Sequence, residues 1–375
     1  MKRLVCAVLS IFLIFFSCII TEESSYALVD TVSTSAGASI LYCANNGRVI
    51  YANRENAKMK MASTTKLLTT LLTLEFAEKN DKIVTFKQSM IEEGSSMYLK
   101  VGEKVHIDDL CIGMMLPSGN DAATAAAVTV AGSKEKFADL MNKRAKSIGM
   151  QSSHFVTPSG LDDDNHYTTA YDMALLMTEC LKNKKFKEIS GSVNKTVAFV
   201  SPNDKTVTYH NHNRLLSEYP YCISGKTGYT MAAGRCLVTA AEKNGITLVA
   251  VTLNDKNDWQ DHKSLYDYGF SVLRSKHFKS TEITQTVVGG KENSVEINIP
   301  QNSFVLDEDD SKIKRKIMIE PFAYAPVKQG ERAGMVLYYQ KGKVIDKKSL
   351  VYKKSVGSEK TEGGFFSFLK SIFGN

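Results

Sequence analysis

The chain has 375 residues, of which 43% are hydrophobic, and carries a formal net charge of +7. This length allows two domains, since domains usually contain about 100–200 residues, and the apolar content excludes a largely disordered chain. The positive charge favours anionic partners such as lipid headgroups or cell-wall polymer. The sequence has no stripe of interleaved basic and aromatic residues, which argues against nucleic acid as a partner.

The first 27 residues have the pattern of a secretory signal peptide. Lys2 and Arg3 precede an apolar run over residues 4–20, and residues 25–27 form a small-x-small cleavage site. The apolar run is close to the ~20 residues that span a bilayer, so an uncleaved anchor is the alternative. A lipoprotein signal ending at Cys18 is a third interpretation. All three predict that the chain is exported.

Beyond the signal the chain has an odd number of cysteines and no C-x-x-C pair. They are Cys43, Cys111, Cys180, Cys222 and Cys236. This pattern indicates neither a disulfide framework nor a zinc site, so we expect single cysteines in the core. We expect no metal and no other cofactor.

The remaining pattern of residues 28–276 predicts strands, a long helical insertion, further strands and a closing helix. The predicted elements are a hairpin at 38–53, a helix starting at Ser63, helices within 107–149, strands at 222–230, 235–241 and 246–253, and a helix at 258–275. This order predicts an α+β domain, in which a mostly antiparallel sheet has helices packed on it.

Residues 277–357 change to short alternating runs such as "SVEINI" and "GMVLYYQ", with no long helical period. We expect a small all-β module here. Its polar residues form no recognisable catalytic set, so a spacer or an interaction role is predicted.

Residues 358–375 form a tail whose apolar side chains fall on one helical face. They are Phe365, Phe368, Leu369, Ile372 and Phe373. An aromatic-rich amphipathic helix next to lysines is typical of an anchor that lies in the plane of the membrane surface, and it is too short to span. The alternative is a terminal helix packed on the protein's own core.

Three short motifs lie in the first domain in a fixed order: Ser63-x-x-Lys66, Ser118-Gly119-Asn120 and Lys226-Thr227-Gly228. Each is weak alone. Ser63 and Ser118 are both good helix N-cap residues, and Lys226 has the pattern of a lysine on an edge strand. Together, on a helix start, a loop and a strand, they indicate a catalytic site.

On these motifs the sequence resembles the penicillin-binding proteins and β-lactamases. More narrowly it resembles the serine-type D-alanyl-D-alanine carboxypeptidases, and the resemblance covers about residues 36–273. It implies a β-lactamase/transpeptidase-like fold followed by a small all-β domain. It also implies removal of the terminal D-alanine from peptidoglycan pentapeptide stems and inhibition by β-lactam antibiotics. The signal peptide and the amphipathic tail together predict a location on the outer face of the cytoplasmic membrane.

The chemistry explains why a lysine should stand one helical turn after the serine. A serine hydroxyl is a poor nucleophile unless a base takes its proton, and Lys66 lies on the same helix face as Ser63. A lysine can act as a base only if its amine is substantially neutral, which burial and a second cation favour. Lys226 is the expected second cation.

The resemblance assigns the remaining steps of acyl transfer to other residues. Ser118 would relay the proton to the leaving nitrogen, and Asn120 would hydrogen-bond both Lys66 and the substrate amide. The backbone N–H groups of Ser63 and Tyr229 would form the oxyanion hole, although many relatives have histidine where this chain has Tyr229.

The resemblance also implies a site for the substrate's terminal carboxylate. Lys226 and Thr227 would hold that group, and Gly228 would leave room for the substrate to lie along the strand as an added strand. His212 lies where some members carry an arginine near the substrate, so it is either a substrate contact or a surface histidine.

Two other functions compete with carboxypeptidase activity. A class A β-lactamase uses a glutamate for deacylation, and the loop at 157–169 has Asp162, Asp163 and Asp164 but no Glu-x-x-Leu-Asn pattern. Within it, residues 158–161 are expected to be structural and not catalytic. A non-catalytic penicillin-sensing or wall-binding protein would have a broken motif, and all three motifs are intact.

Overall fold

The computed structural model describes residues 32–307 and 312–359. The predicted signal peptide and most of the predicted tail, from residue 360 onward, lie outside the described residues. Within them, no helix is long and apolar enough to cross a membrane.

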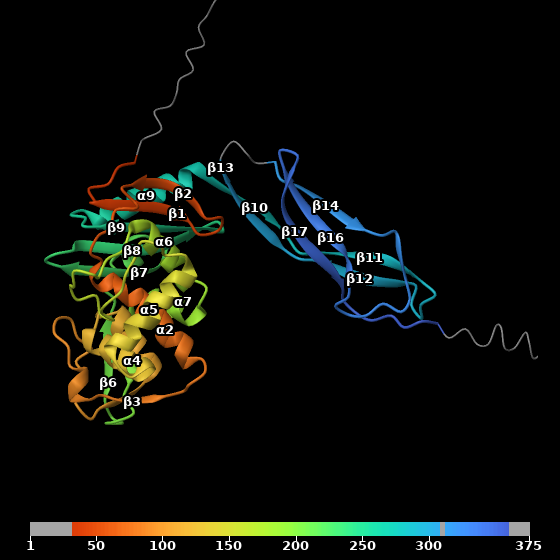
Figure 1. The fold of residues 1–375 in the computed structure, drawn as a ribbon. Helices are drawn as coiled ribbons and strands as arrows, with labels where there is room; N and C mark the ends of the chain where they lie inside the picture. Colours follow the sequence, from red (N-terminus) through yellow and green to blue (C-terminus); the bar gives the residue numbers. More distant parts are fainter. Residues whose placement is uncertain (1–31, 308–311, 360–375) are drawn as a thin grey trace, which may run out of the picture. The chain divides into compact units, whose positions relative to one another are not determined.

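An antiparallel five-stranded sheet forms the centre of the first domain, in the order β2-β1-β9-β8-β7 (Figure 1). The strands are β1 (Ala38–Cys43), β2 (Arg48–Asn53), β7 (Cys222–Thr230), β8 (Gly234–Lys243) and β9 (Ile246–Leu253). Both predicted hairpins are confirmed, since β1 pairs with β2 and β8 with β9. β7 lies at one edge of the sheet, with its outer side unpaired by any other strand of that sheet.

Alternate residues of the strands face two different helical layers. Val238 and Val251 pack into the core shared with the helical insertion. Thr239 and Thr252 point the other way, where their hydroxyls contact the ring of His262 on α9 (Asp258–Val272). Because side chains alternate across a strand, the sheet is covered on both faces, as Figure 1 shows.

The helical insertion is confirmed, and it consists mainly of short helices packed around α2. The helical segments are η1 (Ala62–Thr65), α2 (Lys66–Ala77), η2 (Gln88–Met90), α3 (Ile107–Met115), α4 (Asn120–Ala131), α5 (Lys134–Ile148), α6 (Ala170–Cys180), α7 (Lys184–Ser190) and α8 (Leu215–Glu218). The small strands are β3 (Ile83–Thr85), β4 (Lys104–His106), β5 (Asn194–Ala198) and β6 (Thr206–His210). Buried alanines let α4 approach α2 and α3 closely.

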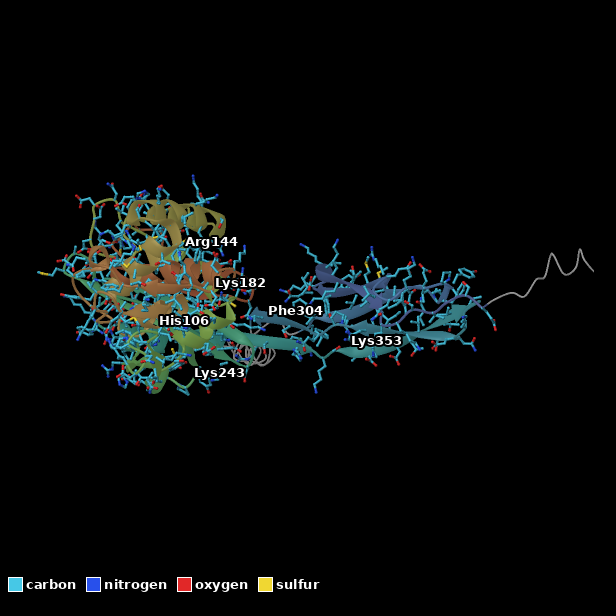
Figure 2. All side chains as sticks on the ribbon, turned by 90° about the horizontal axis from the view of Figure 1, so that it is seen from below. His106, Arg144, Lys182, Lys243, Phe304 and Lys353 are labelled. Atoms are coloured by element: carbon cyan, nitrogen blue, oxygen red, sulfur yellow. The ribbon has the colours of Figure 1, made fainter. Side chains whose placement is uncertain are left out.

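An ion-pair network at the surface connects three of these helices. Arg144 on α5, labelled in Figure 2, contacts Glu75 on α2 at 2.6 Å and Glu179 on α6 at 2.8 Å. Surface pairs of this kind contribute little individually, so the buried apolar core provides most of the stability.

The helix predicted at 258–275 is present, but its predicted C-terminal end is wrong. α9 stops at Val272, and Leu273–Phe278 forms strand β10, which pairs with β13. The residues of β10 are mostly polar and exposed, so local pattern gave no signal for a strand, and pairing with a distant segment decides its conformation.

The second region is an all-β module, as expected. Its further strands are β11 (Thr281–Val288), β12 (Ser294–Ile299), β13 (Asn302–Asp307), β14 (Lys314–Ile319), β15 (Phe322–Tyr324), β16 (Arg332–Gln340) and β17 (Lys343–Tyr352). Six of them form a sheet in the order β14-β16-β17-β12-β11-β15. Phe304, labelled in Figure 2, packs against Phe278 and Tyr338 in the module's core.

All five cysteines of the described chain are free, as predicted. Four are buried and Cys222 is half-buried. Burial raises the pKa of the Cys222 thiol to about 11 and that of Cys236 to about 12. Such thiols remain protonated near neutral pH and are poor nucleophiles.

Candidate active site

Ser63 lies in the 3₁₀ turn η1, immediately before helix α2. The turn is held by two threonine hydroxyls, since Thr64 Oγ1 donates to the Met61 carbonyl and Thr65 Oγ1 to the Ala62 carbonyl, at 2.6 and 2.8 Å. The alternative role of Ser63 as a helix cap is wrong, because neither η1 nor α2 has a side-chain cap. The Ser63 hydroxyl is therefore available for other contacts.

Lys66 is the first residue of α2 and is fully buried. Its Nζ atom lies 2.9 Å from Ser63 Oγ, 2.7 Å from Asn120 Oδ1 and 2.7 Å from the Ser159 carbonyl oxygen. Burial lowers the pKa of Lys66 well below its usual range, and the positive charge of Lys226 lowers it further, whereas Asp121 opposes the shift. The geometry therefore combines a serine with a lysine that readily loses its proton.

Asn120, the first residue of α4, is fixed by the backbone of a neighbouring loop. Its Nδ2 donates to the Glu93 carbonyl at 2.6 Å, and its backbone N–H donates to the Ser95 carbonyl at 2.7 Å. A carbonyl can only accept, so Nδ2 must face Glu93 and Oδ1 must face Lys66. The orientation of the amide is thus set by the network around it.

Ser118 is buried and has a left-handed backbone conformation, with φ of 62°. Ala62, next to Ser63, has φ of 47°. Such conformations cost about 1–2 kcal/mol in residues other than glycine and are common at functional sites. The alternative role of Ser118 as a helix cap is wrong, because the N-cap of α4 is Gly119 and the helix has no side-chain cap.

The edge strand β7 brings Lys226, Thr227, Gly228 and Tyr229 to the same site. A Cβ atom added at Gly228 would lie 3.0 Å from the backbone nitrogen of Ser63, so glycine permits this close approach. The Lys226 side chain is only 1% exposed, its Nζ donates to the Thr227 carbonyl at 2.8 Å, and burial lowers its pKa to about 7. Tyr229 is exposed.

A pocket of about 470 Å³ connects the residues of the three motifs. It is lined by Ser63, Ser95, Ser118, His212, Thr227, Gly228, Tyr229, Arg235, Cys236, Asp258 and Trp259. His212 is therefore placed at the pocket, and its pKa is lowered by partial burial and by the charge of Lys226. Another pocket, of about 430 Å³, lies at residues 142–154 and contains none of the motif residues.

Sequence reasoning missed the wall of the pocket formed by Arg235, Asp258 and Trp259. Arg235 on β8 pairs with Asp258 at the start of α9, and its guanidinium lies 5.8 Å from the ring centroid of Trp259. These residues are far apart in the chain, and none belongs to a motif. Trp259 is the only tryptophan of the chain. This was the one feature of the sequence that could have indicated this wall of the pocket.

Residues 158–161 were expected to be structural, and one backbone atom among them contacts Lys66. The Ser159 carbonyl is held there because Gly160 packs directly on η1: a Cβ at Gly160 would lie 1.9 Å from the Ala62 carbonyl oxygen. Gly160 also has a φ of 86°, which side chains rarely adopt. This loop therefore positions an acceptor for Lys66.

His166 is a buried histidine that connects the same loop to the nucleophile turn. Its Nδ1 accepts the Val156 N–H at 3.0 Å, so the proton is on Nε2, which lies 2.8 Å from Thr65 Oγ1. Burial lowers the pKa of His166 to about 4. The ring is therefore neutral at physiological pH and braces η1.

The fold and this arrangement are those of the transpeptidase-like serine enzymes. The chain belongs to the D-alanyl-D-alanine carboxypeptidase family, whose profile matches residues 25–257, and a second profile, the C-terminal domain of penicillin-binding protein 5, matches residues 274–358.

Named relatives and solved structures agree with this assignment. The chain is 29% identical to D-alanyl-D-alanine carboxypeptidase DacF of Bacillus subtilis, over 100% of this chain and 99% of that one. It is 31% identical to DacC of Escherichia coli, over 92% and 89%. Penicillin-binding protein 5 of Haemophilus influenzae superposes with a TM-score of 0.64 at 26% identity, over 87% and 98%. The Streptomyces K15 DD-transpeptidase superposes with a TM-score of 0.61 at 28% identity, over 64% and 98%.

Proposed function

We propose that this chain removes the terminal D-alanine from the pentapeptide stems of peptidoglycan through an acyl-enzyme on Ser63. The observation that carries the proposal is the set of three contacts made by the buried amine of Lys66. The same acyl-enzyme step explains covalent binding of penicillin, in which the β-lactam carbonyl takes the place of the peptide carbonyl.

Lys66 is the base, and its partners direct its lone pair. Asn120 Oδ1 and the Ser159 carbonyl can only accept, so they take both N–H bonds of a neutral amine. The remaining tetrahedral position of Nζ faces Ser63 Oγ. A neutral Lys66 therefore presents its lone pair to the hydroxyl proton of Ser63, and its lowered pKa favours this neutral form.

Acylation forms the bond from Ser63 Oγ to the carbonyl carbon of the penultimate D-alanine. The backbone N–H groups of Ser63 and Tyr229 stabilise the negative oxygen of the tetrahedral intermediate. The C–N bond then breaks, and the proton taken by Lys66 passes through Ser118 to the leaving nitrogen of D-alanine. Water then attacks the ester carbon, the Oγ–C bond breaks, and Ser63 regains a proton.

Recognition of the terminal carboxylate is assigned to Lys226 and Thr227. Lys226 is buried next to the pocket, and an anion would favour its protonated form. Asn120 also hydrogen-bonds the substrate amide in this proposal, and Gly228 lets the peptide lie along β7 as an added strand. His212, which lines the same pocket, also contacts the substrate in this proposal.

The test is release of D-alanine from an acetylated pentapeptide that ends in D-Ala-D-Ala. The wild-type chain should release it, and Ser63→Ala should release none and should not be labelled by a fluorescent penicillin. Ser63 is half-buried and its removal leaves no large cavity, so the variant should fold. Covalent labelling retained in Ser63→Ala would contradict the assignment.

We also propose how the enzyme is located. Residues 1–27 direct export, 28–276 carry catalysis, 277–357 act as a spacer, and the tail at 358–375 holds the mature enzyme on the outer face of the cytoplasmic membrane. Aromatic and aliphatic side chains contribute roughly 1.5–3 kcal/mol each when fully transferred from water, so a few of them suffice for useful affinity.

Fractionation of a chain ending at Glu362 tests this location. With the signal peptide cleaved, the shortened enzyme should leave the membrane fraction while keeping its activity on a soluble peptide. Equal retention of both chains on the membrane would place the anchor elsewhere, most simply in an uncleaved N-terminal segment.

A further inference from the structure

Two aromatic side chains and a valine lie exposed at one edge of the β module. Phe322 and Tyr324, the first and last residues of β15, are 43% and 70% exposed, and their rings meet edge to face with centroids 5.4 Å apart. Val288, the last residue of β11, is 44% exposed and is the register partner of Tyr324. Because Ala323 between the two aromatic residues packs on the module's core, these three side chains share the outer face of the sheet. They form one surface, the aromatic patch.

The packing of the module does not explain why the aromatic patch is apolar. β15 is the last strand in its six-stranded sheet, so no further strand of that sheet lies beside it. The core of the module lies on the other face, where Val287 and Ala323 contact it. Apolar side chains that are exposed singly are common on protein surfaces, whereas adjoining ones indicate a contact surface. We therefore expect the aromatic patch to contact something outside the module.

The chain leaves the described structure next to the aromatic patch. The backbone N–H of Glu359 donates to the Gly289 carbonyl at 2.9 Å, and Gly289 directly follows Val288. The first apolar residue of the predicted tail, Phe365, comes six positions after Glu359. Six residues span at most about 20 Å, so a tail bound to a membrane holds this end of the module within about that distance of the lipid.

The charged side chains at this end of the module are balanced in sign. Lys354 and Glu292 form an ion pair. Lys291 and Glu359 lie on two backbone segments that are held together, since the Lys291 N–H donates to the Gly357 carbonyl at 2.9 Å. Two lysines thus accompany two glutamates, and a lipid surface is neither strongly attracted nor repelled by them. A contact between the aromatic patch and lipid therefore depends on the apolar side chains, which salt does not screen.

We propose that the aromatic patch lies in the headgroup region of a lipid bilayer, as a second membrane contact beside the tail. Tyrosine and other amphipathic rings favour this region, where the ring is shielded from water and a hydroxyl can remain hydrated. The proposal rests on the membrane location proposed above and goes beyond it, because the patch belongs to the folded module. A tail alone leaves the module free to turn about its attachment, whereas two contacts fix its orientation on the membrane.

The first experiment places a fluorescent probe in the aromatic patch of the mature full-length chain. Tyr324→Trp is compared with Val344→Trp, at a residue that is 50% exposed near the start of β17, whereas the tail follows the end of that strand. The vesicles contain phosphatidylglycerol and phosphatidylcholine brominated on its acyl chains. Bound Tyr324→Trp should emit at shorter wavelength and be quenched by the bromines. Val344→Trp should be quenched no more than the wild-type chain, whose single tryptophan is Trp259.

The second experiment measures binding of the full-length chain to the same vesicles by co-sedimentation. Phe322→Ser combined with Tyr324→Ser should weaken binding about five- to twentyfold, and the loss should persist at high salt. The matched control is Val344→Ser combined with Ile345→Ser, which also removes two exposed apolar side chains of the module and should bind within about twofold of wild type. Thermal unfolding shows that each protein is folded, and D-alanine release from a soluble peptide should be the same in all of them.

The outcomes separate this proposal from the earlier ones. If the chain binds vesicles but Tyr324→Trp is not quenched, or if the two double variants bind equally, the role of the aromatic patch is overturned and the tail anchor stands. If the emission of Tyr324→Trp is already shifted without vesicles, and this shift is lost in a chain ending at Glu362 or on dilution, the tail or a second copy covers the patch and the proposal is also overturned. If the full-length chain binds no vesicles, the proposed location and the patch fail together, whereas D-alanine release tests the catalytic function independently.

Discussion

The catalytic domain and the β module bury different kinds of side chain. In the catalytic domain Lys66 and Lys226 are 0% and 1% exposed, and the Asp121 carboxylate is buried near them. Among the described residues from Leu273 onward, the buried side chains are apolar or aromatic apart from the neutral Gln285. Burying a charge costs free energy, so the two lysines indicate chemistry, whereas the module's core indicates packing alone.

Backbone strain is distributed in the same way. Ala62, next to Ser63, and Ser118, which lines the same pocket as Ser63, adopt left-handed conformations. Other non-glycine residues of the domain with positive φ are Arg54, Tyr98, Asn244 and Asn254. In the described part of the module the comparable residue is Lys341, which lies with Gly342 in the hairpin turn between β16 and β17. A left-handed residue in such a turn has an ordinary structural reason. The comparison predicts that changes at the buried lysines and their partners alter activity more than stability, and that changes in the core of the module do the reverse.

The largest effect is expected for Lys66→Arg, which keeps the positive charge but removes the base. A guanidinium is not deprotonated near neutral pH, and general base catalysis contributes about 10²–10⁴-fold. The rate of acylation by fluorescent penicillin should therefore fall at least about a hundredfold. Lys182→Arg, at an exposed position labelled in Figure 2, is the control and should acylate normally. A rate for Lys66→Arg within threefold of wild type would show that another group takes the proton.

Gly160→Ala should damage both activity and stability. The added Cβ would lie 1.9 Å from the Ala62 carbonyl oxygen, at a φ of 86°, so the loop carrying the Ser159 acceptor must move. We expect acylation to slow about ten- to hundredfold and unfolding free energy to fall by about 2–5 kcal/mol.

The matched control for this change is Gly102→Ala. Gly102 has a φ of 92°, and an added Cβ would meet no atom within 4 Å. It should lose about 1–2 kcal/mol of stability and acylate at the wild-type rate. Equal acylation rates in the two variants would mean that the Ser159 carbonyl does not position Lys66. Both quantities are measured by denaturant unfolding and penicillin labelling.

Features that depend on neighbours in sequence were predictable. Ser63 and Lys66 are one helical turn apart, and the strands of the sheet alternate or lie around short turns, so local pattern was sufficient. The order of the three motifs then predicted that Ser118 and β7 would meet the nucleophile. Their meeting in one pocket agrees with that expectation.

Features made by backbone atoms or by distant pairing were not predictable. The partners that orient Asn120 and Lys66 are carbonyl groups of Glu93 and Ser159, and every residue type has such a group. Likewise, β10 has a polar sequence and is a strand because β13 lies beside it. No motif or periodicity encodes either contact.

The pH dependence of kcat/KM should distinguish the two buried lysines, with a smaller effect than the substitutions above. The pKa of Lys226 is about 7 and that of Lys66 is lowered as well, so kcat/KM should rise as Lys66 loses its proton and fall as Lys226 loses its own, above pH 7. In Lys226→Arg the descending limb should move to much higher pH, because guanidinium stays protonated. An unchanged descending limb would assign it to another group.

The titration of Lys226 should also make the free energy of unfolding depend on pH. Between pH 7 and the unfolded pKa of 10.5, Lys226 is protonated in the unfolded chain and neutral in the folded one, so its contribution to stability increases with pH by about 1.4 kcal/mol per unit. Below pH 7 both states are protonated and the contribution is constant. Denaturant unfolding of wild type and Lys226→Met from pH 7 to 9 measures the difference in slope. Equal slopes would contradict a lowered pKa.

The smallest effect on catalysis is expected for Leu350→Ala in the β module. Leu350 is fully buried on β17 within the module's core, so its truncation should cost about 2–5 kcal/mol of local stability. Hydrogen exchange should increase in β16 and β17, whereas D-alanine release from a soluble peptide should stay within twofold of wild type at 25 °C. All residues assigned to catalysis precede Leu273, and none of them belongs to the module's core. If release fell in proportion to the loss of exchange protection, the module would be contributing to the active site, and the division between a catalytic domain and a packing module would be wrong.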